Sequence, residues 1–243
     1  MKFFLKINFF RYIFFTTFGF LNSFFMKFSK EIPDNQLIVL GRGESLNYFK
    51  TNYKLFENIK HILLINFSKD DFVDFDSRLL ENKIVHICVN ITEDIIPINL
   101  LFKLTFGKIF IARYRKFIPS KVNPNRKNYK ANIYSNKVKY FPQLMKKHWW
   151  LNNSGLFSIA YALEILKIKN LYLFGFDFYQ GKFHNSNLQD GFLTKKDAED
   201  HKAAGVILKK NFSNLIDQFP QNIFYLPDTE NFRVYNQQNV KKI

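Results

Sequence analysis

Small and polar residues that could bind a nucleotide follow the predicted strands of this chain. Gly41 and Gly43 come directly after the first apolar run of the globular part, and Ser45 opens the helix behind it. A glycine pair lets the backbone approach a nucleotide closely, and the serine hydroxyl can cap the helix or bind phosphate. The next two apolar runs end in Asn66 and Asn90. Because the carboxyl ends of parallel strands meet at one edge of a sheet, these residues predict a ligand crevice.

Residues 153–180 contain a predicted helix, a predicted strand and a polar turn in direct succession. Apolar side chains recur in the helix at spacings of three and four residues, and Ser154 can cap its start. A helix amino terminus attracts anions, and ligands bind beyond the carboxyl ends of parallel strands. The small or polar residues at these two places are Ser154, Gly155, Gly175, Asp177 and Tyr179. The stretch therefore predicts half of a βαβ unit with polar groups at its ligand-binding end.

Apolar runs alternate along the chain with stretches long enough for helices. This alternation is typical of a mostly parallel sheet with helices on both faces. The expected strands occupy residues 37–40, 61–66, 84–89, 108–112, 170–175 and 222–226. We therefore predict an α/β fold with a single doubly wound sheet, whose strands are buried on both faces.

The first 30 residues differ from the rest of the chain. They hold eleven of the 31 Phe, with Lys and Arg spaced among them. Only fifteen uncharged residues separate Arg11 from Lys27, fewer than the roughly 20 that span a bilayer. We expect residues 1–30 to associate with a membrane in its plane or as a marginal anchor; a packed helix and a targeting peptide are the alternatives.

One domain is expected over residues 36–230, because the chain is long enough for one α/β core but not for a second full domain. Two polar stretches interrupt it. A basic insert at 113–147 contains a loop or small subdomain that could form a lid. A flap at 181–200 is expected to lead into a helix at 201–218.

The formal net charge of +16 has two possible explanations. Of the 36 basic residues, 29 are Lys, and Asn, Ile and Phe are abundant, so AT-rich codons explain the charge as readily as an anionic partner does. Residues 95–163 nevertheless hold thirteen Lys and Arg and no acidic residue, which favours anionic ligands or acidic lipid headgroups. No RNA-binding aromatic signature or zinc-finger spacing accompanies them, so we expect no nucleic-acid partner. The single Cys88 cannot form an internal disulfide and is expected to be buried, in a cytoplasmic protein.

Taken together, these residues resemble the bacterial sialyltransferases of glycosyltransferase family 42. The resemblance covers residues 36–227 and rests on LGRGESL, on the two strand-end asparagines, on NSGLFSIAYALEIL followed by LYLFGFDFYQ, and on His201 leading the next helix. It implies a Rossmann-like domain of the GT-A variant with a small lid. The implied activity is metal-independent transfer of an acidic nonulosonic sugar from a CMP donor to a glycan or glycolipid hydroxyl, with inversion. Lipooligosaccharide synthesis at the inner face of the membrane would fit.

The resemblance also implies a role for each matching residue. His201 would be the general base that takes the proton from the acceptor hydroxyl. Tyr179 would donate a hydrogen bond to the leaving phosphate, whose charge a hydroxyl can stabilise without a metal. Asn66 would face the CMP-sugar donor. The donor would be bound by Gly41, Gly43 and Ser45 at the cytidine and phosphate, by Asn90, Asn153, Ser154 and Gly155 at the sugar and phosphate, and by Gly175 and Asp177 at the nucleoside. Neither a metal nor another cofactor is implied, and the state of oligomerisation is left open.

Other motifs point to other functions. The pair Asp74 and Asp76 matches the DxD pattern that holds a divalent metal in many glycosyltransferases. Trp149 and Trp150 offer an aromatic platform for a sugar, although core packing is expected of at least one of them. The alternatives to a sialyltransferase-like enzyme are a magnesium-dependent pyrophosphokinase or motility-glycosylation type of domain, and a non-enzymatic protein that binds membrane surfaces.

Overall fold

The computed structural model describes residues 26–67, 71–72, 75–89, 103–111, 138–139, 141–151, 153–178, 195–228 and 237–243. Of the residues singled out above, Asn90, Tyr179 and Asp74 lie outside this part of the chain, and His201 is described by its backbone alone. Residues 1–25, most of the basic insert and residues 181–194 of the predicted flap also lie outside it.

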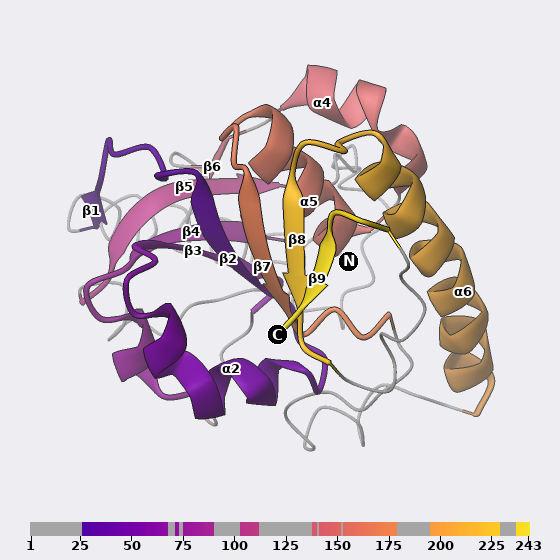
Figure 1. Ribbon diagram of the computed structural model, residues 1–243, viewed down its shortest axis with the longest axis horizontal. Helices are drawn as coiled ribbons and strands as arrows, with labels where there is room; N and C mark the ends of the chain where they lie inside the picture. Colours follow the sequence, from indigo (N-terminus) through magenta and orange to yellow (C-terminus); the bar gives the residue numbers. More distant parts are fainter. Residues whose placement is uncertain are drawn as a thin grey trace, which may run out of the picture.

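The described strands form one parallel sheet (Figure 1). In chain order they are β1 (Lys27–Phe28), β2 (Gln36–Leu40), β3 (His61–Ile65), β4 (Ile84–Val89), β5 (Thr105–Ile111), β6 (Val138–Lys139), β7 (Asn170–Phe174), β8 (Ile223–Leu226) and β9 (Val240–Lys242). Across the sheet the order is β1-β5-β4-β3-β2-β7-β8-β9, and β6 pairs with the end of β5. The prediction of an α/β fold with a parallel sheet is confirmed for this part of the chain.

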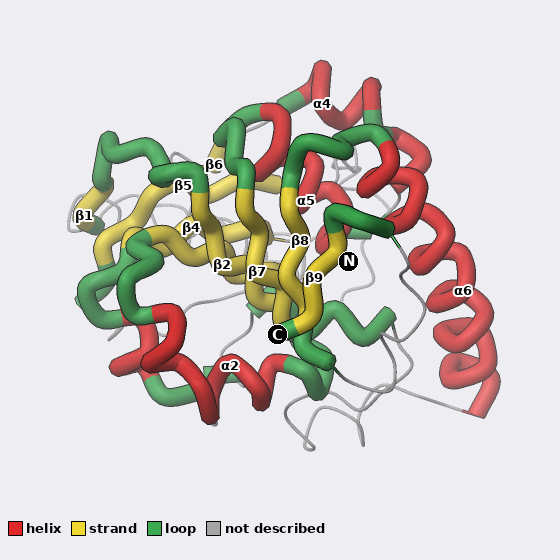
Figure 2. The backbone as a smooth tube through the Cα atoms, in the orientation of Figure 1, coloured by secondary structure: helices red, strands yellow, loops and turns green. Residues whose placement is uncertain are grey.

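Helices cover both faces of the sheet (Figures 1 and 2). They are α2 (Leu46–Asn52), α4 (Pro142–Lys147), α5 (Ser154–Glu164) and α6 (Lys195–Asp217), with the short 3-10 turns η1 (Tyr53–Phe56), η2 (Ser77–Leu80) and η5 (Trp149–Leu151). Leu37 and Val39 of β2 pack with the core under α5 and α6, whereas Ile38 and Leu40 pack with the core under α2. The strand period of two thus builds two cores, one on each face.

Strand β7 departs from the prediction that strands are buried on both faces. Its residues Asn170 and Tyr172 are only half-buried. The Tyr172 ring stacks on Tyr225 of β8, with centroids 4.5 Å apart and planes 6° from parallel. The rings of Phe49 and Phe56 pack against Phe174, at the carboxyl end of the strand. Because α2 and η1 cover that end, the start of β7 is less covered on the α2 face.

Two predicted boundaries are corrected by the structure. Helix α6 begins at Lys195, so residues 195–200, predicted to belong to the flap, are helical. This segment looks like a polar loop, but Lys, Ala and Glu are among the residues with the highest helix propensity. At the other end of the chain, β1 lies within the predicted membrane segment and pairs with β5, and Met26 is buried. The last residues of that segment therefore belong to the folded domain.

Among the described residues, no helix is both long and apolar enough to cross a membrane. Cys88 is fully buried in β4, as predicted.

Candidate functional site

The winding of the sheet reverses between the adjacent strands β2 and β7. Strands β3, β4 and β5 follow β2 on one side, while β7 lies on its other side. The helix after β2 covers one face of the sheet, and the helix after β7 covers the opposite face. At such a switch point the segments that follow the two strands leave the sheet toward opposite faces. Ligands of open α/β sheets bind in the crevice between such segments. The predicted residues Gly41, Gly43, Ser45, Gly175 and Asp177 all lie here.

The turns that follow β2 and β7 are locked together by backbone contacts. The Gly41 N–H donates to the Phe174 carbonyl oxygen at 2.7 Å, and the Gly43 N–H donates to the Gly175 carbonyl oxygen at 3.0 Å. A Cβ on Gly41 would lie 2.4 Å from the Gly175 carbonyl oxygen, and Gly175 has a φ of +73°. Both glycines are therefore required by the contact between the turns, with or without a ligand.

Asp177 ties the second turn to the start of α2. Its Oδ2 accepts a hydrogen bond from the Ser45 N–H at 2.9 Å, and the Ser45 Oγ accepts one from the Gly175 N–H at 2.8 Å. A Cβ on Gly43 would lie 2.3 Å from Asp177 Oδ2, so this glycine makes room for the carboxylate. Burial raises the pKa of Asp177 above its ordinary value, and hydrogen bonds from Ser45 offset part of the rise.

These contacts correct the predicted cap of α2. The Ser45 side chain makes no cap hydrogen bond, because its oxygen bonds to the β7 turn instead. The Ser45 amide, from which a phosphate oxygen could accept, is already bonded to the protein's own carboxylate.

The start of α5 is also capped by the protein, one residue earlier than predicted. Asn153 has the extended backbone of an N-cap, and its Oδ1 accepts hydrogen bonds from the Gly155 and Leu156 N–H groups at 2.7 and 3.2 Å. Ser154 is instead the first, buried residue of the helix. A Cβ on Gly155 would lie 3.0 Å from the Phe176 ring, which places the start of α5 against the turn that carries Asp177.

Two acceptor oxygens at this edge of the sheet have no hydrogen-bond donor among the described residues. They are Asn66 Oδ1 and Asp177 Oδ1, and both atoms are buried. Asn66 follows β3 with a φ of +53°, the left-handed conformation that asparagine tolerates. Strands β3 and β7 flank β2, so the two residues follow strands about 10 Å apart. Because a buried acceptor without a donor costs free energy, a ligand with N–H or O–H groups would be stabilised here.

The residues expected to do chemistry are not brought together within the described part of the chain. Tyr179 and Asn90 lie outside it, and His201 lies at the end of the second turn of α6, with no side-chain position described. In Figure 1, α6 starts on the side of the sheet where β8 ends.

The DxD pattern is described only at its second aspartate. Asp76 accepts a hydrogen bond from the Arg78 N–H at 2.9 Å, and the Arg78 guanidinium pairs with its Oδ2 at 2.7 Å. The side chain thus caps η2. Among the described residues, no group of three or more His, Cys, Asp and Glu is arranged to hold a metal.

A buried histidine pair lies at the opposite, amino-terminal side of the sheet. His61 Nδ1 of β3 and His86 Nε2 of β4 are 3.1 Å apart. The Lys108 N–H donates to His86 Nδ1 at 3.2 Å, so neutral His86 carries its proton on Nε2 and donates it to His61. The pairing of β4 with β5 shifts register opposite His86, and a Cβ on Gly107 would lie 2.4 Å from its ring. Burial, reinforced by His61 and Lys108, lowers the pKa of His86 to about 3.

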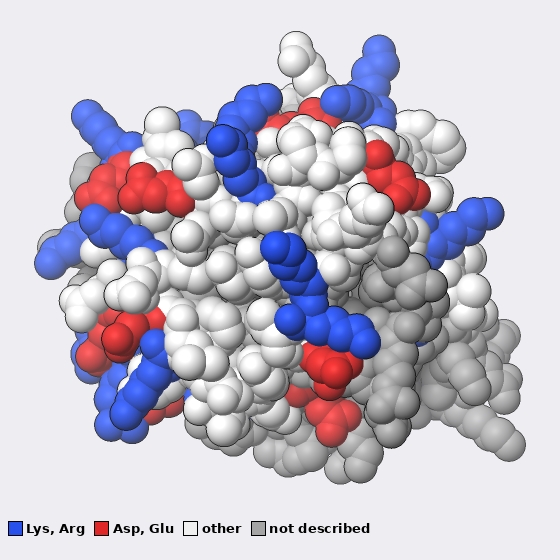
Figure 3. All heavy atoms as spheres, viewed as in Figure 1, with Lys and Arg blue, Asp and Glu red and all other residues white. Residues whose placement is uncertain are grey.

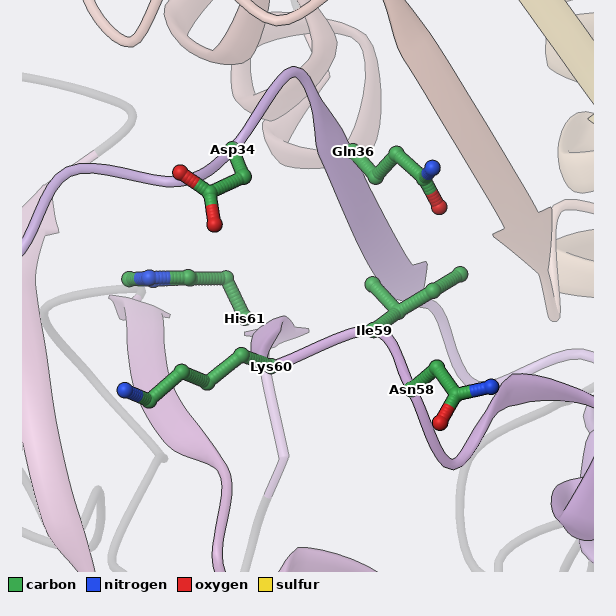
Figure 4. A pocket seen from close by; sticks show the side chains of 6 residues that line it. All are labelled: Asp34, Gln36, Asn58, Ile59, Lys60 and His61. Atoms are coloured by element: carbon green, nitrogen blue, oxygen red, sulfur yellow. The ribbon is translucent and has the colours of Figure 1, made fainter.

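His61 also borders a polar pocket of about 270 Å³ (Figure 4). The pocket is lined by Asp34, Gln36, Asn58, Ile59, Lys60 and His61. In this view the His61 ring lies between the side chains of Asp34 and Lys60. Sequence reasoning missed this cluster, although a histidine in each of two neighbouring apolar runs, HILLI and VHICV, was a signal for it.

No protein-family model, curated protein or solved structure matches this chain. The family resemblance therefore rests on the sequence motifs alone.

Alanine at Gly43 should lower the free energy of unfolding by about 1–3 kcal/mol, a typical cost of overpacking, because its Cβ meets the Asp177 carboxylate. Alanine at Gly41 should cost at least as much, since its Cβ meets the Gly175 backbone. Asp177→Ala should relieve the cost at Gly43 but not at Gly41, as measured by urea unfolding of the single and double variants. Strictly additive costs for Gly43 and Asp177 would contradict the described packing.

The histidine pair should make the protein less stable in acid. The folded-state pKa of His86 is about 3 and its ordinary value is 6.5, so between these values the unfolded chain binds more protons. Stability from this group is fully present above about pH 6.5 and is lost as the pH falls toward about 3. His86→Asn should flatten the pH dependence of the unfolding free energy by up to about 1.4 kcal/mol per pH unit. A lower stability with an unchanged pH slope would show that His86 only packs.

Proposed function

We propose that this protein is a metal-independent, inverting glycosyltransferase that transfers an acidic nonulosonic sugar from a CMP donor to a glycan hydroxyl. The observation that carries the proposal is that the motif residues following β2 and β7 meet at the switch point of the sheet, with Asn66 two strands from Asp177. The proposal includes a Rossmann-like domain of the GT-A variant, with which the strand order is consistent. It also includes a glycan or glycolipid acceptor and a location at the inner face of the membrane.

A cytidine nucleotide suits the two acceptor oxygens at this edge. Cytosine carries an exocyclic amine and ribose carries two hydroxyls, all of which can donate. Asn66 Oδ1 and Asp177 Oδ1 are buried acceptors without a donor in the described part of the chain. Hydrogen bonds from the nucleoside would offset their desolvation, and a ligand with acceptors at the same positions would be rejected.

The bonded helix starts restrict where the phosphate can bind. The amide of Ser45 is bonded to Asp177, and those of Gly155 and Leu156 are bonded to Asn153. In the proposed enzyme, Ser45, Asn153 and Asp177 therefore shape the crevice, and Tyr179 takes the charge of the leaving phosphate. His201 takes the proton of the acceptor hydroxyl, which a neutral imidazole can do near neutral pH.

Binding and transfer can be measured with the full-length chain. CMP should raise the melting temperature more than UMP, GDP or ATP at equal concentration, because a ligand that binds only the native state stabilises it by mass action. With a CMP-nonulosonate donor, His201→Ala should lower the transfer rate by about 10²–10⁴-fold. Tyr179→Phe should lower it by about 10²–10³-fold. Lys202→Ala, next to His201 on α6, is the matched control and should retain the activity.

The proposal fails if CMP-nonulosonates are neither transferred nor hydrolysed, or if His201→Ala and Lys202→Ala are equally active. Activity abolished by EDTA, with a preference for ATP, would favour the pyrophosphokinase type of domain instead.

A further inference from the structure

Trp149 is the most exposed large apolar side chain of the described residues. It lies in η5 with 77 % of its surface exposed, whereas its neighbour Trp150 is half-buried against the core under α5 and α6. The expectation that one tryptophan serves in core packing is thus confirmed for Trp150. Trp149 is left with a large apolar surface in water, which in a folded protein marks an interaction site when neighbouring side chains extend it.

Helix α6 provides the neighbouring apolar side chains. The Asn211 side chain donates to the Trp150 carbonyl oxygen at 3.1 Å, which fixes α6 against η5. Ile207 lies one helical turn before Asn211, on the same side of the helix, and is 61 % exposed. Val206 is 62 % exposed and lies beside it. Trp149, Val206 and Ile207 thus provide exposed apolar surface on η5 and on the part of α6 that packs against it.

Exposed lysines accompany these apolar side chains. Lys146 and Lys147 precede Trp149 at the end of α4, and Lys210 lies one turn after Val206 and Ile207. The acidic Glu164 contacts this group, and it is paired with Lys147 at 2.8 Å and with His148 at 2.5 Å. Figure 3, in the orientation of Figure 1, shows basic side chains (Lys and Arg, blue) projecting at the top of the molecule, where α4 lies. We call Lys146, Lys147, Trp149, Val206, Ile207 and Lys210 the Trp149 surface.

We propose that the Trp149 surface docks on a lipid bilayer that contains anionic headgroups. A tryptophan with lysines beside it is matched to the membrane interface, where the indole lies at headgroup depth and the ammonium groups face lipid phosphates. The positive charge of the surface argues for this partner over a neutral glycan. The inference concerns the folded domain and does not depend on the activity proposed above.

Tryptophan fluorescence tests the proposal directly, because the chain has only two Trp. In the full-length Trp150→Phe variant, emission reports on Trp149 alone. Vesicles of phosphatidylcholine with phosphatidylglycerol should shift this emission to the blue, and brominated lipids should quench it. Vesicles of phosphatidylcholine alone should do so more weakly. If Trp150→Phe does not fold, the difference between the wild type and Trp149→Phe gives the same signal.

Matched variants separate the Trp149 surface from the rest of the chain. Replacing Lys146 and Lys210 by alanine should weaken binding to anionic vesicles by up to about 25-fold, about fivefold for each lysine. Lys54 and Leu55 lie in η1 on the other face of the sheet, and Leu55 is 71 % exposed. Alanine at these two positions should leave vesicle binding unchanged.

Three outcomes would overturn the proposal. In the first, the protein binds vesicles while Trp149 emission stays that of a water-exposed indole, so another segment carries the binding. In the second, the emission shifts with protein concentration in the absence of lipid, so a second copy covers the surface. In the third, a soluble oligosaccharide shifts the emission and vesicles do not, so Trp149 is a sugar platform.

Discussion

The hydrogen bond between the Asp177 carboxylate and the Ser45 amide, together with the close contact of Gly41 with Gly175, joins the turns that follow the two central strands of the sheet. Strands β2 and β7 are far apart in sequence but adjacent in the sheet. The chain leaves them toward opposite faces, and the contacts between the turns link the two exits.

Because of these contacts, the glycines and the helix starts have a structural role in the protein itself. A glycine-rich turn before a helix is typical of phosphate binding, because it leaves backbone amides free. Here the Asp177 carboxylate accepts the hydrogen bond of the Ser45 backbone amide, and the Asn153 side-chain oxygen accepts that of Gly155. What the edge offers a ligand instead is a set of buried acceptors, Asn66 Oδ1 and Asp177 Oδ1. This chemistry selects for the donor groups of a nucleoside more than for the charge of a phosphate.

The sequence predicted the central strands well because strands buried in parallel sheets are continuous apolar runs. It missed β1, β6 and β9, which have only two or three residues and are too short to carry a pattern. It placed Gly41, Ser45, Gly175 and Asp177 after the ends of two strands that prove to be neighbours, since strand ends follow from strand positions. It could not show that Asp177 bonds to Ser45, because that contact joins residues 132 apart in the chain. The His61 and His86 pair was missed for the same reason: its two members meet only once β3 and β4 are paired.

In the proposed enzyme, a cytidine nucleotide binds where the two turns interlock. This binding can be followed by titrating the isotope-labelled, full-length protein with CMP and recording the backbone amide signals in NMR spectra. The largest chemical-shift changes should fall on Gly43, Ser45, Asn66 and Gly175, with little change at Lys60 and His61 beside the pocket on the opposite edge. Changes centred on Lys60 and His61, or no saturable change at the interlocked turns, would contradict it.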